Sequence, residues 1–209
     1  MDTRGIFQAL QAKFGENAVF GYEPPKTPQL DDYFFVASEH LVKLARHLRD
    51  EPSLHFESLE CLTGVDYPDA PVMMPTQAAS SEKGTIHVVY HLRSYEIRHR
   101  CAMKVSLPRS SPRVASLCQV WSSANWMERE CYDLLGVVFI DHPDLRRLLL
   151  PDDWVGHPLR KDYQQQESYH GIATKRPSPL DLLTLEKPAA KSAAKPAVKP
   201  APNKSPDHG

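Results

Sequence analysis

The sequence predicts an α+β fold: a mostly antiparallel sheet with helices packed on one face, an extended C-terminal arm and a disordered tail. Two stretches near residues 85–105 alternate apolar and polar residues, as half-buried strands do. Apolar residues recur at helical spacing on either side of them. We expect an α+β core over residues 1–136 with a loop insertion near 70–84, an arm over 137–175, and a Lys/Pro/Ala-rich tail over 176–209.

The first elements follow from spacing and from helix-ending residues. Residues 3–15 read as a helix that Gly15 ends, and 18–22 as a short extended piece. Tyr33–Val36 reads as a strand. Ser38 is expected to cap a second helix. The apolar face of that helix consists of Leu41, Leu44, Ala45 and Leu48.

The middle of the chain predicts strands and a loop. His55–Leu62 reads as a strand, and Pro68–Gly84 as an exposed loop rich in Pro and Ser. Thr85–Leu92 and Glu96–Val105 read as two strands joined by a hairpin at Arg93–Tyr95. The predicted inward faces are Ile86, Val88, Tyr90 and Leu92 on one strand and Ile97, Cys101, Met103 and Val105 on the other.

Two helices and an arm are expected next. Ser111–Pro112 resembles the start of a helix that carries Val114, Leu117, Cys118 and Trp121. A second helix runs from about Ser123 to Gly136, and its apolar stripe is Met127, Cys131, Leu134 and Leu135. Beyond Val137 the periodicity fades, and three prolines rule out a long helix. An arm that cannot bury its own apolar residues is expected to bury them on a partner.

The charge, apolar runs and cysteines of the chain exclude several classes of function. The formal net charge of −1 argues against a general binder of nucleic acid. No run approaches the roughly 20 apolar residues of a membrane span, and no targeting signal is evident at the N-terminus, so any membrane association is expected to be indirect. The four cysteines form no CxxC pair, so a metal or iron–sulfur site is not expected. The tail from Lys187 holds five lysines and one acid and is expected to be disordered.

The sequence contains no recognised catalytic or nucleotide-binding motif. His87 and His91 are four residues apart on a predicted strand, about 13 Å, too far to share a zinc ion. The charges of the 123–136 helix leave two interpretations open: a solvated face, or a docking face whose charges pair with a partner. An i,i+4 pair between Arg129 and Asp133 is expected there. The leucines and prolines of residues 142–151 favour a protein groove over nucleic acid.

Residues 126–163 resemble a known family. Trp126 to Val137 reads WMERECYDLLGV and resembles the pattern WFERExYDMFGI; HPDLRRLL, PDDW and GHPLRKDY follow at 142, 151 and 156. These stretches are similar to the C subunit of NADH:quinone oxidoreductase, respiratory complex I, also called the 30 kDa or iron–sulfur protein 3 subunit. Gln164 departs from the pattern, which often has proline there. The resemblance covers roughly residues 3–175 and excludes the tail.

The resemblance implies a non-catalytic subunit of the peripheral arm. In the complex, electrons pass from NADH through FMN and iron–sulfur clusters to quinone, and protons are pumped. The chain itself is expected to hold no flavin, cluster or metal and to have no catalytic residues. It is expected to scaffold the large D subunit and other peripheral-arm subunits at the cytoplasmic face of the cell membrane. The alternative is the equivalent subunit of an energy-converting hydrogenase or of a ferredoxin- or reduced-deazaflavin-dependent dehydrogenase.

The expected partner-docking residues all lie in the 126–163 segment, and the docking arm, residues 137–175, begins within it. They are Trp126, Glu128, Arg129, Glu130, Tyr132, Asp133, His142, Pro143, Leu145, Arg146, Arg147, Asp152, Trp154, His157, Pro158, Arg160 and Asp162.

Overall fold

The computed structural model describes residues 2–25, 27, 31–75 and 83–174. The chain divides into two compact units, of which the first ends at Gln164 and the second begins at Gln165. The first unit extends beyond the core boundary expected at residue 136. Its described residues hold the main sheet, three α-helices and the whole motif segment, residues 126–163.

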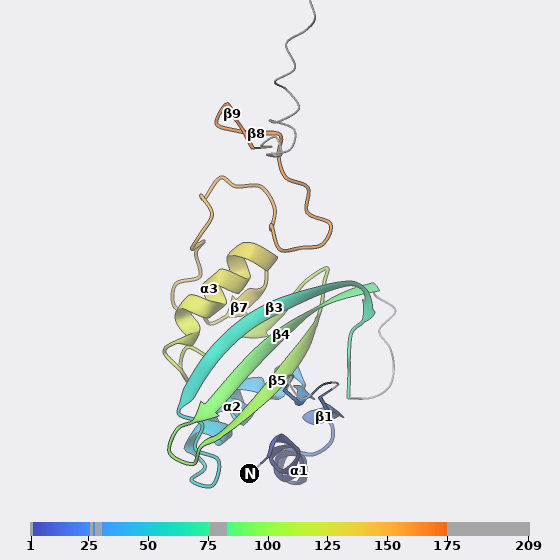
Figure 1. The fold of residues 1–209 in the computed structure, drawn as a ribbon, viewed down its shortest axis with the longest axis vertical. Coiled ribbons are helices and arrows are strands. Elements are labelled where there is room, and N and C mark those ends of the chain that lie inside the picture. The colour runs from blue at the N-terminus through green and yellow to red at the C-terminus, as the bar shows by residue number, and fades with distance from the viewer. Residues whose placement is uncertain (1, 26, 28–30, 76–82, 175–209) are drawn as a thin grey trace, which may run out of the picture. The chain divides into compact units, whose positions relative to one another are not determined.

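The centre of the first unit is a five-stranded sheet in the order β1-β2-β5-β4-β3 (Figure 1). Its strands are β1 (Val19–Glu23), β2 (Tyr33–Val36), β3 (Ser58–Pro71), β4 (Lys83–Ser94) and β5 (His99–Pro108). All neighbours pair antiparallel except β2 and β5, which are parallel. The predicted, mostly antiparallel sheet is confirmed.

Helices α1 (Thr3–Phe14), α2 (Leu41–Asp50) and α3 (Ala124–Leu135) share one apolar core with the sheet. The predicted inward residues of β4 are buried, as are the four predicted on α2. Figure 1 shows α3 alongside β3, at the end of the sheet opposite β1. Gly15 ends α1 with a backbone bond to Gln11, as predicted.

The hairpin between β4 and β5 turns later than expected. Residues 95–98 form the turn, and Arg98 adopts a left-handed φ of 59°. The Glu57 carboxylate accepts from the backbone N–H groups of Tyr95 and Glu96, which fixes the turn there. The prediction that Ile97 faces the core was therefore wrong, and its side chain is 39% exposed.

The helix expected from Ser111 does not form. Residues Arg113–Ala115 instead form β6, which pairs in parallel with β7 (Val138–Ile140). Val114 and Phe139 face each other in this ladder, and both are buried. A Ser-Pro pair also favours extended backbone just before the proline. Pairing with the distant strand β7 then makes residues 113–115 a strand. The residues around β7 thus complete the core and do not begin a free arm.

Two smaller expectations also fail. Ser38 caps no helix by its side chain; it begins the short 3-10 helix η1 (Ser38–His40), which leads into α2. The loop expected over Pro68–Gly84 is shorter, because β3 extends to Pro71 and β4 begins at Lys83. After β3 the chain folds back, and the N–H of Met73 donates to Ser106 Oγ.

In the second unit, residues 165–174 are described. They contain the two-residue strands β8 (Ser168–Tyr169) and β9 (Ile172–Ala173), which pair antiparallel. The expected disordered tail, residues 176–209, lies outside the described residues.

Candidate docking site

Helix α3 carries the first part of the motif and is positioned by its apolar stripe. Cys131 and Leu135 are buried, and Leu135 packs over Gly64 of β3, where an added Cβ would lie 2.3 Å from Leu135 Cδ1. Gly136 ends the helix in a left-handed conformation with φ of 75°. The predicted bounds of this helix are confirmed.

The charges of α3 do not form the exposed face that the sequence suggested. Glu128, Arg129 and Asp133 are 0%, 5% and 1% exposed. Arg129 and Asp133 have other hydrogen-bond partners in place of the expected i,i+4 pair. The partners of all three come from loops 10 to 18 residues away along the chain, which helical periodicity cannot reveal. A solvated charged face is therefore wrong at these three positions.

Glu128 closes a buried network at the start of α3. Its carboxylate accepts from the Ser116 hydroxyl at 2.6 Å, the Leu117 N–H at 2.7 Å and the Cys118 thiol at 3.5 Å. Burial raises the pKa of Glu128, although these three donors favour the ionised form. The network ties α3 to the segment that follows β6.

Cys118, Glu128 and His142 are, among the described residues, a group spaced closely enough to hold a metal ion. All three side chains already take part in hydrogen bonds. His142 Nδ1 accepts from the Asp144 N–H, so its proton sits on Nε2, which faces the Asn125 carbonyl at 3.1 Å. Burial also raises the pKa of Cys118 to about 11, which opposes the thiolate form that a metal needs. The group therefore fits a hydrogen-bond network better than a metal site.

Asp133 fastens the leucine run of the arm. One carboxylate oxygen accepts from the successive N–H groups of residues 148, 149 and 150 at 2.7–3.0 Å. The other accepts from the Arg147 guanidinium at 3.0 Å. Burial alone would raise the pKa of Asp133, but these donors outweigh it and the pKa is lowered.

A second buried aspartate, which the sequence reasoning missed, holds the end of the motif. Asp66 of β3 accepts two hydrogen bonds from Arg109, at 2.7 and 3.0 Å, and one from the Lys161 N–H at 2.8 Å. Arg109 also pairs with Asp162. Nothing local to Asp66 predicts that it would contact residue 161 or share Arg109 with Asp162.

The remaining motif contacts lead back to the C-terminal end of α3. His157 lies 2.9 Å from the Asp133 carbonyl, and Arg160 donates to the Leu135 carbonyl at 2.7 Å. A Cβ on Gly136 would lie 2.6 Å from His157 Nε2, so glycine is needed here for space as well as for its φ. The last-turn carbonyls of α3 thus bind the arm.

The structure sorts the expected docking residues by burial. Those that are buried are Glu128, Arg129 and Asp133. The half-buried ones are Tyr132, His142, Leu145, Arg147, Trp154, His157, Pro158 and Arg160. Exposed to solvent are Trp126, Glu130, Pro143, Arg146, Asp152 and Asp162. Only these six exposed residues can contact a partner with most of their side chains.

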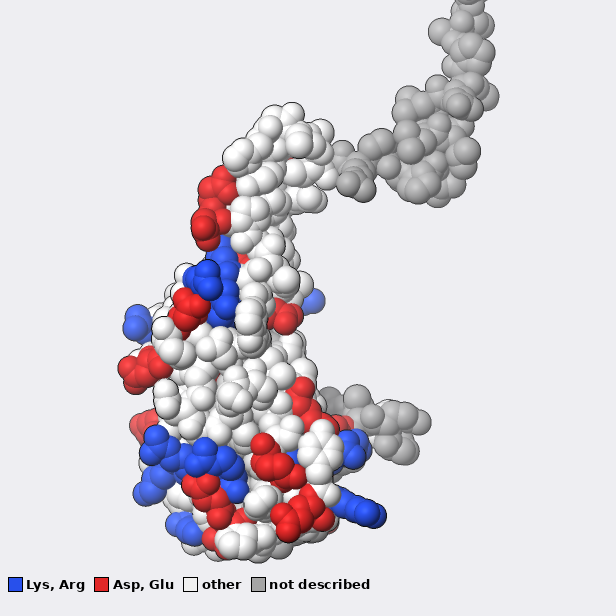
Figure 2. All heavy atoms as spheres, turned by 90° about the vertical axis from the view of Figure 1, so that its left-hand side faces the viewer, with Lys and Arg blue, Asp and Glu red and all other residues white. Residues whose placement is uncertain are grey.

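Exposed apolar residues add to that surface. Trp126, Leu149, Val155 and Leu159 are 61%, 62%, 68% and 54% exposed. Figure 2 views the first unit from the α3 side, and the middle of that face is largely free of charged side chains. The three aliphatic residues were not among the expected docking residues. Exposed apolar side chains mark a protein interface where they form a patch.

Residues 34–169 match the model of a family described as respiratory-chain NADH dehydrogenase, 30 Kd subunit. The chain belongs to this family. The C subunit of NADH-quinone oxidoreductase from Chlorobium phaeobacteroides is 39% identical over 177 residues, covering 81% of this chain and 97% of the relative. The subunit of the same name from Streptomyces coelicolor is 44% identical over 131 residues; the match spans 62% of this chain and 47% of the relative.

Solved structures agree with the family fold. The trypsin-resistant fragment of Nqo5 matches with a TM-score of 0.51 and 27% identity, over 69% of this chain and 100% of the fragment. A protein of the archaeal membrane-bound sulfane sulfur reductase matches with a TM-score of 0.60, over 85% of this chain and 96% of its own length. At 20% identity this second match shows the fold alone. Within the part of this chain that the structure describes, each helix is too short or too polar to cross a bilayer.

Proposed function

We propose that the chain is the non-catalytic C subunit of a proton-translocating NADH:quinone oxidoreductase. In this role it scaffolds the large D subunit and its neighbours in the peripheral arm, at the cytoplasmic face of the membrane. The observation that carries the proposal is which residues of the family motif are buried and which are exposed. Its buried charges hold the chain's own arm, and its exposed residues present an aromatic ring, a proline and charged groups that can contact another subunit.

We also propose that this subunit holds no cofactor, and that FMN and the iron–sulfur clusters reside in its partners. Cys101 and Cys131 are buried in the core, where burial raises the thiol pKa. Cys118 belongs to the satisfied network around Glu128. The use of these three thiols supports a scaffold in preference to an electron carrier; the fourth, Cys61, is exposed.

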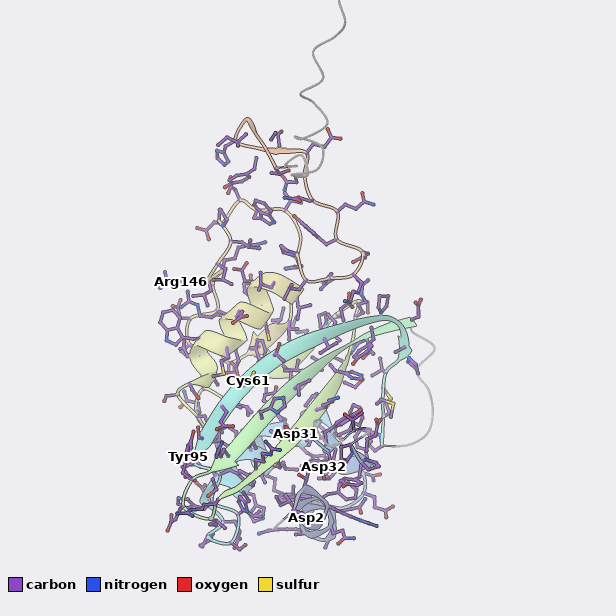
Figure 3. All side chains as sticks on the ribbon, in the orientation of Figure 1. Asp2, Asp31, Asp32, Cys61, Tyr95 and Arg146 are labelled. Carbon is purple, nitrogen blue, oxygen red and sulfur yellow. The ribbon has the colours of Figure 1, made fainter. Side chains whose placement is uncertain are left out.

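Arg146 offers a test of docking through the motif. Its side chain is 71% exposed and pairs with the exposed Asp144, so Arg146→Ala should leave the fold intact. Figure 3 shows Arg146 at the outer edge of the first unit beside α3. We expect the variant to reduce recovery of assembled complex and its NADH:quinone reductase activity, measured on membranes from cells carrying it.

A matched control is available on another face. Arg100 is also 71% exposed and pairs with Asp31 at 2.8 Å, but it lies on β5, outside the motif. Arg100→Ala should leave assembly and activity unchanged. If Arg146→Ala and Arg100→Ala give the same assembly and activity, Arg146 is not part of the docking surface. Glu128→Ala is a poorer probe, because loss of a buried network would destabilise α3 and impair assembly indirectly.

The competing assignment, to a hydrogenase-type or another dehydrogenase complex, differs in its partners. The proposed assignment requires an NADH-oxidising, FMN-binding subunit in the same complex. Nickel-binding partners would support the alternative.

A further inference from the structure

The end of the family motif encloses a hollow of about 290 Å³ beside the C-terminal end of α3. Its walls are residues 155–157, 160 and 162–164. Among them, Val155 and the ring of Tyr163 are apolar, while Arg160 and the Tyr163 hydroxyl can donate hydrogen bonds. Binding sites are concave and combine apolar walls with a few fixed polar groups, so the hollow has the features of a small site.

The guanidinium of Arg160 is held at one end and open at the other. Its Nε donates to the Leu135 carbonyl at 2.7 Å, which fixes the plane of the group. Its two outer nitrogens have no acceptor among the described residues. The side chain is half-buried, so solvent reaches it only in part. Donors of a charged group that are withdrawn from water without an acceptor are costly, and an incoming acceptor removes that cost.

The positive charge of Arg160 is incompletely balanced. Burial is the main cause that lowers its pKa, and the neighbouring Arg109 lowers it further. Asp66 and Asp162 act in the opposite direction but do not offset these effects, and both carboxylates already pair with Arg109. An anion in the hollow would therefore be stabilised. Asp162 also lines the hollow, which favours a singly charged anion over a phosphate dianion.

Tyr163 supplies a second donor on the same wall. The Trp154 indole N–H donates to the Tyr163 oxygen at 3.1 Å, and an indole N–H only donates, so the phenol keeps its own proton to give. Backbone bonds of 3.1 Å, from Arg160 to the His157 carbonyl and from Tyr163 to the Arg160 carbonyl, fix the two side chains on one turn. A guanidinium fork beside a hydroxyl donor matches the two planar oxygens of a carboxylate.

We propose that this hollow is a binding site for a carboxylate attached to an apolar body. The outer nitrogens of Arg160 bind the two oxygens, the Tyr163 hydroxyl donates to one of them, and the apolar body lies against Val155 and the Tyr163 ring. The carboxylate belongs either to a free small molecule or to an aspartate or glutamate side chain of a partner subunit. The site goes beyond the proposed function, because the chain alone contains all of it.

The first arm of the test titrates the purified full chain with benzoate by calorimetry. Benzyl alcohol is the matched probe, since it keeps the ring and lacks the charge, and chloride at equal ionic strength controls for general anion binding. The site is located by phenylglyoxal, which modifies accessible arginines and is mapped by mass spectrometry. Benzoate should bind saturably and protect Arg160 but not the exposed Arg113, and the other two probes should do neither.

Variants separate the fork from local charge. Arg160→Lys keeps the charge and loses the fork, so benzoate affinity should fall by about tenfold. Tyr163→Phe should weaken binding by less than Arg160→Lys, because it removes one neutral donor. Lys161→Gln removes the charge of an exposed neighbour outside the hollow and should leave the affinity unchanged. Equal loss in Arg160→Lys and Lys161→Gln would overturn the site, as would a wild-type chain that binds benzoate no better than benzyl alcohol.

A second arm distinguishes the two sources of the carboxylate. The same titration is made on the complex that the tagged chain brings from membranes of its host. If a partner's acidic side chain fills the hollow, Arg160 is protected without benzoate and benzoate no longer binds. If the ligand is a free small molecule, benzoate binds the complex as it binds the chain. A negative first arm removes the site and leaves the proposed function standing, because that arm uses the chain alone.

Discussion

At the residue scale, two buried carboxylates, those of Asp133 and Asp66, bind the backbone of the chain's own arm. Asp133 satisfies three backbone N–H groups in a row, and Asp66 satisfies Arg109 and a fourth backbone N–H. A carboxylate with several donors is stabilised in its charged form even when buried. These residues therefore determine the path of the arm over α3.

Replacing Asp133 with Asn should loosen the arm locally. The Asn amide would turn an N–H group toward Arg147, and hydrogen bonds to a charged acceptor contribute roughly 1.5–3 kcal/mol. The amides of residues 148–150 should then exchange about tenfold faster or more, as measured by hydrogen exchange on the purified chain. Asp144→Asn is the control, because Asp144 is exposed and bonds to Arg146.

The same contact predicts a pH dependence. The pKa of Asp133 lies below the ordinary 3.8, so the contact is intact above pH 3.8 and is lost as pH falls through the lowered value. Protection of residues 148–150 that persists unchanged in Asp133→Asn would show that the carboxylate does not hold the arm.

The residue scale also shows what the sequence could not reveal. Helical spacing placed Cys131 and Leu135 inward correctly, because an apolar stripe is a local property. It also placed Glu128 and Asp133 outside, because their donors lie in distant segments. Charged residues become interior only when a long-range partner satisfies them, and one sequence contains no sign of that partner. The family resemblance identified the segment 126–163. The structure showed which of its residues bind the chain's own arm and which are exposed.

At the element scale, prediction succeeded where a strand or helix had a single preferred face. The inward residues of β4 and α2 are those expected from their periods of two and 3.6. It failed at β6, whose three residues are extended because they pair with β7, and at the β4–β5 turn, which Glu57 fixes from just before β3. Both failures come from contacts between segments distant in sequence.

The contact between α3 and β3 depends on Gly64. A Cβ at this position would lie 2.3 Å from Leu135 Cδ1 and 3.9 Å from Cys131 Sγ, so the helix would have to shift. Gly64→Ala should lower the free energy of unfolding by about 1–3 kcal/mol, measured by urea denaturation. Thr63→Ala, at an exposed neighbour on the same strand, should change it by less than about 0.5 kcal/mol.

A double-mutant cycle isolates the clash. Leu135→Ala removes the atom that an alanine at residue 64 would meet, so the two substitutions together should cost less than the sum of their separate effects. Strict additivity would show that the close approach in the structure is not what limits residue 64.

At the scale of the whole molecule, the first unit is an α+β domain whose family motif holds its own second part through buried charges and leaves six of the expected docking residues exposed. Family membership and the buried network agree with a structural role in a larger assembly. The fold class, the family and the location of the motif could all be predicted from the sequence. The division of the motif into internal and exposed residues required the three-dimensional structure.

The most direct test of the central claim is what the tagged full chain brings with it when purified from membranes of its own host under native conditions, identified by mass spectrometry. We expect the large D subunit together with an NADH-oxidising subunit, in a complex that reduces quinone with NADH. Recovery of the chain alone, or with partners that lack any NADH-oxidising subunit, would contradict the proposed role.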